Sequence, residues 1–156
     1  MRAQGIDHVS VSVSDIDRSI EFYHGLLGVP LLGRGEDDGP PLAPEMGSAR
    51  SRFRYADLDI GGGQVLELLQ WLVPGATGRR APVHEPGSGH VGLRVDDLDE
   101  ALHVLASAGV HAQFEPVRLE GPGWWAGARV VYVTDPDGAT VELVEWPSSE
   151  GRQVPG

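Results

Sequence analysis

Two segments of this chain repeat each other, and the duplication constrains the fold more than any other feature. The string HVSVSVSDID begins at His8, and HVGLRVDDLD begins at His90, an offset of 82 (90 − 8). A second pair follows in the same order, because LELLQW ends at Trp71 and VELVEW ends at Trp146, an offset of 75 (146 − 71). Repeated matches in a fixed order are typical of duplicated structural units. The sequence therefore predicts two consecutive modules.

The predicted modules span about 5–73 and 87–147, joined by the Pro/Gly-rich stretch 74–89. Together they are expected to form a single domain over 1–150, followed by a disordered tail at 151–156.

Each module is predicted to fold as a strand, a helix and three further strands. Residues 6–13 alternate between apolar and polar, which is the pattern of a half-buried strand. Ser14-x-x-Asp17 and Asp97-x-x-Glu100 resemble the capping box that begins a helix. Asp135-Pro136-Asp137-Gly138 predicts a turn before the last strand. The expected fold class is α+β, with two tandem βαβββ modules.

Strand alternation places one histidine and one glutamate of each module on the same sheet face. His8 and Glu67 are predicted to face away from the helix of the first module, and His90 and Glu142 away from the helix of the second. A carboxylate flanked by Leu and Trp is costly to bury without a partner, and a shared cation would offset that cost. Imidazole and carboxylate together suit one divalent transition metal per site, namely Ni, Co, Zn, Mn or Fe(II).

Plainer interpretations exist for each of these residues. A single strand histidine is usually structural or exposed, and a strand glutamate is usually solvated. The repeated Glu-x-x-x-Trp pattern is also explained by a duplication that preserves the fold alone. The joint pattern of two His and two Glu on one face is what favours a metal site.

Several strings in the chain resemble the vicinal oxygen chelate superfamily, which includes glyoxalase, bleomycin-resistance and dioxygenase-like proteins. They are DHVSVSVSDID, EFYHGLLG, GHVGLRVDDLD and DPDGATVEL, and they extend over nearly the whole sequence. The resemblance implies the glyoxalase I fold, in which paired βαβββ modules form curled mixed sheets around a metal cavity. It implies that the metal ligands are His8, Glu67, His90 and Glu142.

The resemblance implies a divalent-metal-dependent lyase or isomerase, glyoxalase- or epimerase-like, acting on a small molecule with vicinal oxygens through a metal-stabilised enediolate. Glu142 and Glu67 are the candidate catalytic bases. The chain departs from glutathione-binding glyoxalases in two places. It has no Arg in Ser10 to Ser14, and Trp71 stands where those enzymes tend to have Asn.

Two other functions fit the same resemblance. A bleomycin-resistance-like protein would bind a small molecule or antibiotic without catalysis, and an oxygenase would use iron. The loop 121–127, which holds two tryptophans between glycines, is either a lid over the ligand or an ordinary hairpin. The residues expected to bind substrate are Phe53, Tyr55, Trp71, Arg94, Trp124, Trp125 and Trp146.

Composition limits the kinds of site and the kinds of partner that the protein can have. The chain has no cysteine, which excludes disulfides, thiolate metal sites and a cysteine nucleophile. Its formal net charge of −11 disfavours nucleic acid and anionic membranes as partners. No apolar run is long enough to span a membrane. We expect a cytoplasmic homodimer whose partner is a small molecule.

Overall fold

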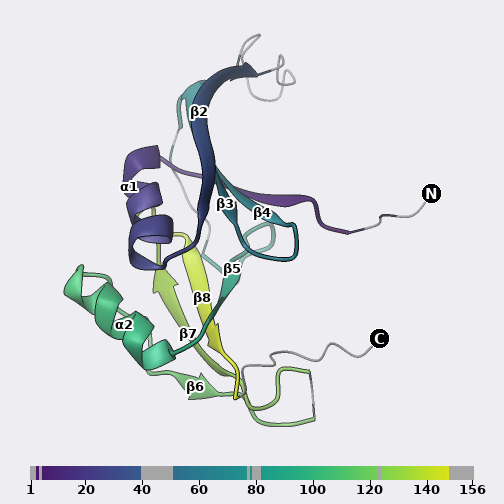
Figure 1. Cartoon of the computed structure of the whole chain (residues 1–156), viewed down its shortest axis with the longest axis vertical. Helices are drawn as coiled ribbons and strands as arrows, with labels where there is room; N and C mark the ends of the chain where they lie inside the picture. Colours follow the sequence, from purple (N-terminus) through teal and green to yellow (C-terminus); the bar gives the residue numbers. More distant parts are fainter. Residues whose placement is uncertain are drawn as a thin grey trace. The chain divides into compact units, whose positions relative to one another are not determined.

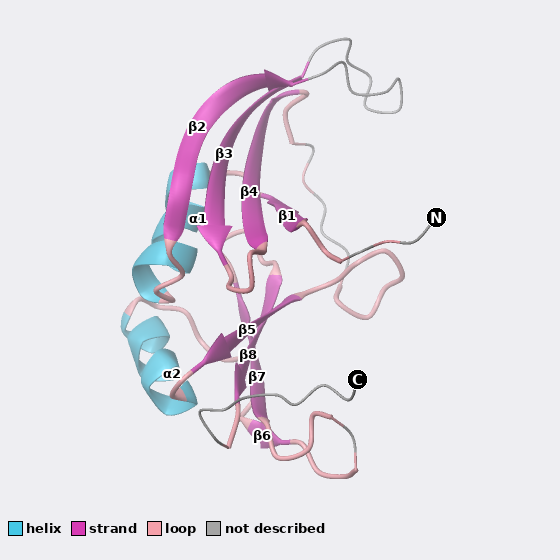
Figure 2. Ribbon diagram, turned by 45° about the vertical axis from the view of Figure 1, so that its right-hand side comes forward, coloured by secondary structure: helices cyan, strands magenta, loops and turns pink. Residues whose placement is uncertain are grey.

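The computed structural model describes residues 3, 5–39, 51–76, 78, 82–122 and 124–147. The chain divides into two compact units, Met1–Arg79 and Arg80–Gly156. Each unit has one four-stranded sheet with its helix on one side (Figures 1 and 2). None of the helices in the described ranges is long and apolar enough to cross a membrane. The tail expected at 151–156 lies outside the described residues.

The first unit contains one helical segment and a sheet of four strands in the order β1-β4-β3-β2. The strands β1 and β4 are parallel, and the other neighbours are antiparallel. The elements are β1 (His8–Ser12), α1 (Ile16–Ile20), the π-helical turn η1 (Glu21–Leu26), β2 (Leu31–Gly39), β3 (Ser51–Asp59) and β4 (Val65–Val73).

The second unit repeats this topology in the sheet order β5-β8-β7-β6, with β5 and β8 parallel. Its elements are β5 (Val91–Val95), α2 (Leu98–Ser107), β6 (Val117–Arg118), β7 (Arg129–Thr134) and β8 (Thr140–Glu145). The predicted α+β fold with two tandem βαβββ modules is therefore confirmed.

The core of each unit lies between the helix and one face of the sheet. Leu66 and Leu68 of β4, like Val141 and Leu143 of β8, are fully buried on this face. Alternation then places the residues between them on the opposite face. Alternation places Val9 of β1 on the helix side as well, but it is 38% exposed. It lies in β1, the edge strand of the sheet.

The helix of the first unit differs from its predicted form. Asp15, not Ser14, is the N-cap residue, and its carboxylate accepts hydrogen bonds from the backbone N–H groups of Asp17 and Arg18. After Ile20 the helix widens into a π-helical turn, in which the N–H of Leu27 donates to the carbonyl of Phe22. In the second unit Asp97 is the N-cap, as predicted.

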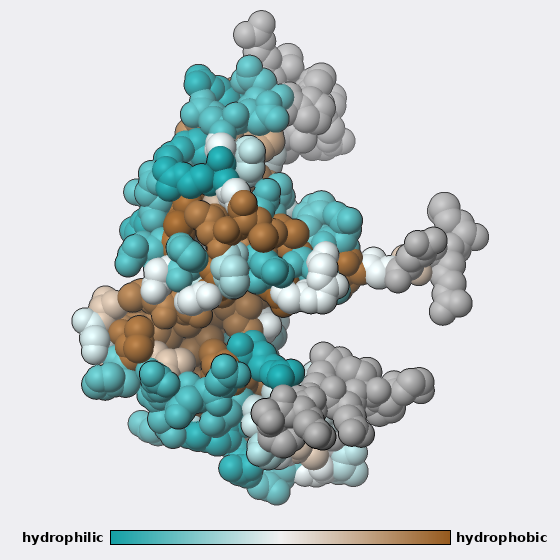
Figure 3. All heavy atoms as spheres, viewed as in Figure 1, coloured by the Kyte–Doolittle hydropathy of each residue, from teal (hydrophilic) through white to brown (hydrophobic). Residues whose placement is uncertain are grey.

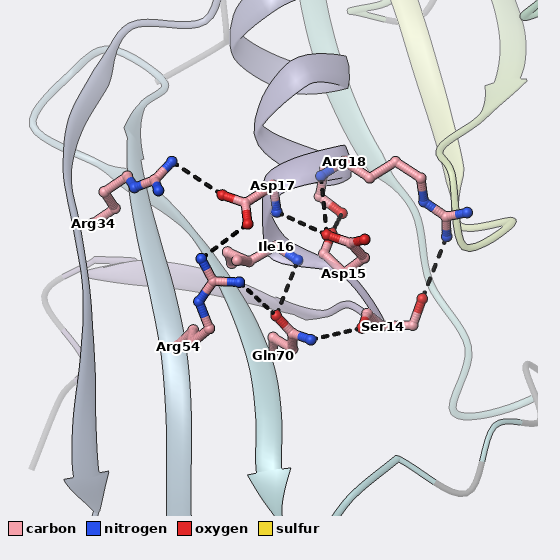
Figure 4. Close-up of polar contacts among 9 residues, drawn as sticks. Ser14, Asp15, Ile16, Asp17, Arg18, Arg34, Arg54 and Gln70 are labelled. Atoms are coloured by element: carbon pink, nitrogen blue, oxygen red, sulfur yellow. Dashed lines mark hydrogen bonds and ion pairs between the residues drawn. The ribbon is translucent and has the colours of Figure 1, made fainter.

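An arginine on the third strand of each unit ties the start of the helix to the sheet. In the first unit Arg54 contacts the carboxylate of Asp17 at 2.9 Å and the amide oxygen of Gln70 at 3.4 Å. Gln70 in turn donates to the carbonyl of Ser14 and accepts from the N–H of Ile16 (Figure 4). We call Arg54, Asp17 and Gln70 the first helix clamp.

The second unit has the same clamp at corresponding positions. Arg129 contacts Asp99 at 2.8 Å and Glu145 at 2.8 Å. The guanidinium lowers the pKa of the Asp99 carboxyl, because it hydrogen-bonds the ionised form. The duplication has thus kept an arginine between the helix start and the last strand, although Gln70 is replaced by Glu145.

The second helix clamp is expected to stabilise the protein at neutral pH. Because the folded-state pKa of Asp99 is depressed, its contribution is present above the ordinary pKa of an aspartate and is lost as the pH falls through the folded value. Replacing Arg129 with Met should lower the Tm by a few degrees at pH 7 and by less at pH 3. Thermal unfolding followed by circular dichroism measures both values.

Arg118→Met is the matched control in the same unit, since Arg118 donates to a backbone carbonyl, that of Gly127. An Arg129→Met protein with an unchanged Tm at pH 7 would contradict a stabilising role for the clamp.

Candidate functional site

Glu67 is the centre of the polar groups on the helix-free face of the first sheet. It lies on β4, and strand pairing places Ser10 of β1 on one side of it and Asp57 of β3 on the other. The hydroxyl of Ser10 donates a hydrogen bond to the Glu67 carboxylate. Glu67 is half-buried, so this bond fixes the carboxylate in a partly desolvated position.

His8 lies two residues before Ser10 on β1 and therefore on the same face. Its Nδ1 lies 2.9 Å from a carboxylate oxygen of Asp7. This contact raises the pKa of His8, and the negative charge of Glu67 raises it further. With Nδ1 engaged by Asp7, the other ring nitrogen, Nε2, is the one left to bind a ligand or a metal.

Asp57 brings a second carboxylate next to Glu67. The two residues are opposite each other in the β3–β4 pair, and Asp57 is also half-buried. Burial raises the pKa of Asp57, and the charge of Glu67 raises it further, while His8 lowers it. Like charges directly opposite each other in a sheet are destabilising.

The second unit pairs a histidine and a glutamate more closely. Nε2 of His90 lies 3.3 Å from a carboxylate oxygen of Glu142, and their side chains are 34% and 23% exposed. Tyr132 of β7 stands opposite Glu142, and its ring lies 5.3 Å from that of His90. Burial and the neighbouring Glu142 raise the pKa of the Tyr132 hydroxyl.

Each unit thus brings together one imidazole and one carboxylate of the four predicted metal ligands. Nowhere in the described part of the chain do three or more His, Cys, Asp or Glu side chains form a group that could hold a metal ion. The full predicted ligand set requires the pair from the first unit and the pair from the second.

The predicted aromatic substrate residues of the first unit lie beside this polar group. Phe53 and Trp71 are paired across β3 and β4, with ring centroids 5.3 Å apart. The indole N–H of Trp71 donates to the hydroxyl of Ser12. Tyr55 lies against Gly35 of β2, where an added Cβ would be 2.8 Å from its hydroxyl. In the space-filling view, apolar atoms gather over β3 and β4 (Figure 3).

In the second unit the loop tryptophans are exposed, and one of them stacks on Trp146, the residue that follows the last strand. Trp124 and Trp146 have ring centroids 6.3 Å apart and nearly parallel planes, and Trp125 meets Trp124 edge-on. Trp124 and Trp125 are 47% and 41% exposed. Arg94 is exposed on β5, opposite Val144.

Ser10, Asp57 and Tyr132 are site residues that the sequence analysis did not identify. Asp57 and Tyr132 are related by the same offset of 75 (132 − 57) as the two glutamates. The offset relates these two positions to each other, but the strand register that places each of them opposite a glutamate is set by long-range hydrogen bonds.

The opposed carboxylates predict a measurable cost in stability. Because the folded-state pKa of Asp57 is raised, its ionised form is disfavoured, and stability is lost as the pH rises through that pKa. Asp57→Asn should therefore raise the Tm of the metal-free protein at pH 7, with little change at pH 3. Asp37→Asn, an exposed position on the same face opposite Phe53, is the control. An Asp57→Asn protein less stable than wild type at pH 7 would contradict the repulsion.

Comparison with known proteins places the chain in a family. Residues 5–143 match the model of the Glyoxalase/Bleomycin resistance protein/Dioxygenase superfamily. The chain is 30% identical over 146 residues to the lactoylglutathione lyase of Escherichia coli O157:H7, covering 88% of this chain and 90% of the relative. It is 29% identical over 151 residues to the 2-epi-5-epi-valiolone epimerase of an Actinomyces species, covering 94% and 81%.

Solved structures agree with this relationship. A glyoxalase family protein from Bacillus cereus superposes with a TM-score of 0.77 at 26% identity, covering 93% of this chain and 95% of that chain. The trypanothione-dependent glyoxalase I of Leishmania major superposes with a TM-score of 0.62, also at 26% identity, covering 92% and 87%. The family model, the relatives and the fold together show that the chain belongs to the glyoxalase/bleomycin resistance/dioxygenase superfamily.

Proposed function

We propose that this protein is a divalent-metal-dependent lyase or isomerase that acts on a small molecule with vicinal oxygens. The observation that carries the proposal is the repeated His–Glu pair on the helix-free face of each sheet, His8 with Glu67 and His90 with Glu142. Relatives named lactoylglutathione lyase and epimerase support the reaction class.

The chemistry of the donor set fits a divalent transition metal. Two imidazoles and two carboxylates suit Ni, Co, Zn, Mn or Fe(II). Neighbouring side chains orient two of the four ligands, because Asp7 contacts His8 and Ser10 donates a hydrogen bond to Glu67. A four-ligand set takes one His–Glu pair from a first unit and one from a second unit. The two units belong either to the same chain or to different chains of a homodimer. We propose that the protein is a homodimer in both cases.

A metal bound there supplies Lewis acidity, which stabilises negative charge on the substrate oxygens. The proton transfer falls to a glutamate of this chain. We assign it to Glu142, whose carboxylate lies beside His90 and Tyr132. Glu67 is held in place by the Ser10 hydroxyl, which suits a residue that keeps its position.

A second candidate function is binding without catalysis, and the stacked pair of the exposed Trp124 and the half-buried Trp146 favours it. Such a pair offers a flat aromatic surface to a planar ligand. Metal content separates the two functions, because sequestration of this kind does not require an ion.

The purified protein is expected to bind about one divalent metal ion per chain, and removal of either histidine should weaken that binding. His8→Ala and His90→Ala should each lower the metal affinity by roughly 10- to 100-fold. Both variants should fold, because neither imidazole belongs to the buried core. Isothermal titration with Ni and Co measures the affinity, and circular dichroism checks the fold.

His103→Ala is the matched control, since this exposed histidine lies on α2, away from the strands that carry the pairs. No metal uptake by the wild type across Ni, Co, Zn, Mn and Fe(II) would overturn the enzyme proposal and leave the binding protein. Unfolded histidine variants would instead mean that the imidazoles are structural.

Replacing a glutamate with glutamine separates catalysis from binding, because the change keeps the size of the side chain and removes most of its basicity. Glu142→Gln should lose most turnover while it keeps much of the metal and of the substrate affinity. Glu67→Gln should have the smaller effect on turnover. Turnover and ligand affinity are measured on substrates found by screening α-hydroxy carbonyls, thiohemiacetals and 2-substituted acyl thioesters. Full turnover in both variants would rule out a glutamate base.

A further inference from the structure

Asp57 lies half-buried on the helix-free side of the first sheet, beside Glu67. On one side it stands opposite Glu67, and on the other side β2 places Gly33 opposite it. A glycine contributes no side chain, and a Cβ added at Gly33 would meet no atom within 4 Å. The neighbouring strand therefore leaves the approach to the Asp57 carboxylate uncovered.

Three other half-buried carboxylates of the first and second units have a defined donor. Ser10 donates to Glu67, Arg129 donates to Glu145, and the N–H of Gly61 donates to Asp59. Among the described residues, no side chain or backbone N–H is hydrogen-bonded to the carboxylate of Asp57. A partly desolvated acceptor without a donor costs free energy, and a donor on a bound ligand would offset that cost.

The second unit has a different group at the corresponding position. Tyr132 stands opposite Glu142 as Asp57 stands opposite Glu67. The Tyr132 ring packs between His90 and Phe114, with centroid distances of 5.3 Å to each. Asp57 has no ring contact of this kind and offers only its acceptor oxygens. The two units therefore differ beside the glutamate. The second unit has a packed phenol there, and the first unit has a carboxylate.

We propose that Asp57 is a substrate-binding residue whose carboxylate accepts a hydrogen bond from a hydroxyl group of the substrate. This inference rests on the proposed function, because the hydroxyl would lie next to the oxygens that the metal binds. It narrows the substrate class to α-hydroxy carbonyl compounds that carry a hydroxyl on the carbon beside the chelating oxygens. The negative charges of Asp57 and Glu67 disfavour an anionic substituent at that place.

Three hydroxamates test the proposal, because a hydroxamate offers a metal two vicinal oxygens. Acetohydroxamate has a methyl group beside the carbonyl, glycolohydroxamate has a hydroxymethyl group, and methoxyacetohydroxamate has the same oxygen without its donor hydrogen. The affinity of each is measured by isothermal titration of the Co(II)-loaded protein, with the visible spectrum of cobalt reporting coordination. Wild type should bind glycolohydroxamate roughly tenfold more tightly than the other two, as expected for a hydrogen bond to a charged acceptor.

The variants assign the preference to one side chain. Asp57→Ala should bind all three hydroxamates with similar affinity, and the isosteric Asp57→Asn should lose most of the preference. Asp37→Ala, the same change at an exposed position on the same sheet face, should keep the full tenfold difference. Circular dichroism establishes that each variant is folded.

The outcomes separate this inference from the proposed function. If acetohydroxamate coordinates the cobalt but wild type shows no preference for glycolohydroxamate, the inference is overturned and the proposed function stands. The inference also fails if both Asp57 variants keep the preference. If no hydroxamate coordinates the metal, the proposed function is overturned, and the role of Asp57 falls with it.

Discussion

The parallel pairing of the first and last strands in each unit is the constraint on which the rest of the structure depends. Parallel neighbours cannot be joined by a tight turn, so the chain must cross over before it returns. The helix made in that crossover covers one face of the sheet and buries Leu66 and Leu68 in the first unit. The opposite face is left free of the helix. On this opposite face, the residue paired with Glu67 is Ser10, and His8 lies two residues before it. In the second unit the residue paired with Glu142 is Gly92, and His90 lies two residues before it.

Duplication has preserved the framework of the two units and changed the side chains around the glutamates. The framework includes an aspartate cap at each helix start and an arginine that links the helix to the last strand, Arg54 in one unit and Arg129 in the other. These contacts hold the crossover helix on its sheet and therefore maintain the strand pairing. The side chains beside the glutamates are not needed for the strand pairing. They can therefore differ between the two units and contact a ligand.

The result is two units with different groups around their glutamates. Glu67 has a hydroxyl donor on one side and the carboxylate of Asp57 on the other, whereas Glu142 has an imidazole and the phenol of Tyr132. An unfavourable carboxylate pair on the helix-free face is better explained by ligand binding than by stability. The same asymmetry fits the different tasks proposed for the two glutamates, a metal ligand for Glu67 and a proton-transfer group for Glu142.

The sequence by itself determined the two βαβββ modules, the succession of helix and strands along each module and the faces on which the His and Glu residues lie. Alternation and helical spacing are local patterns, and the repeat reinforced each of them, so these features could be read without coordinates. Tertiary structure alone decided which residues stand side by side. Strand register depends on hydrogen bonds between segments far apart in the chain, so the Ser10–Glu67 bond and the opposition of Asp57 and Glu67 had no local signal. The choice of Asp15 over Ser14 as the helix cap was likewise settled by tertiary contacts, because the Ser14 carbonyl is bound by Gln70 from β4.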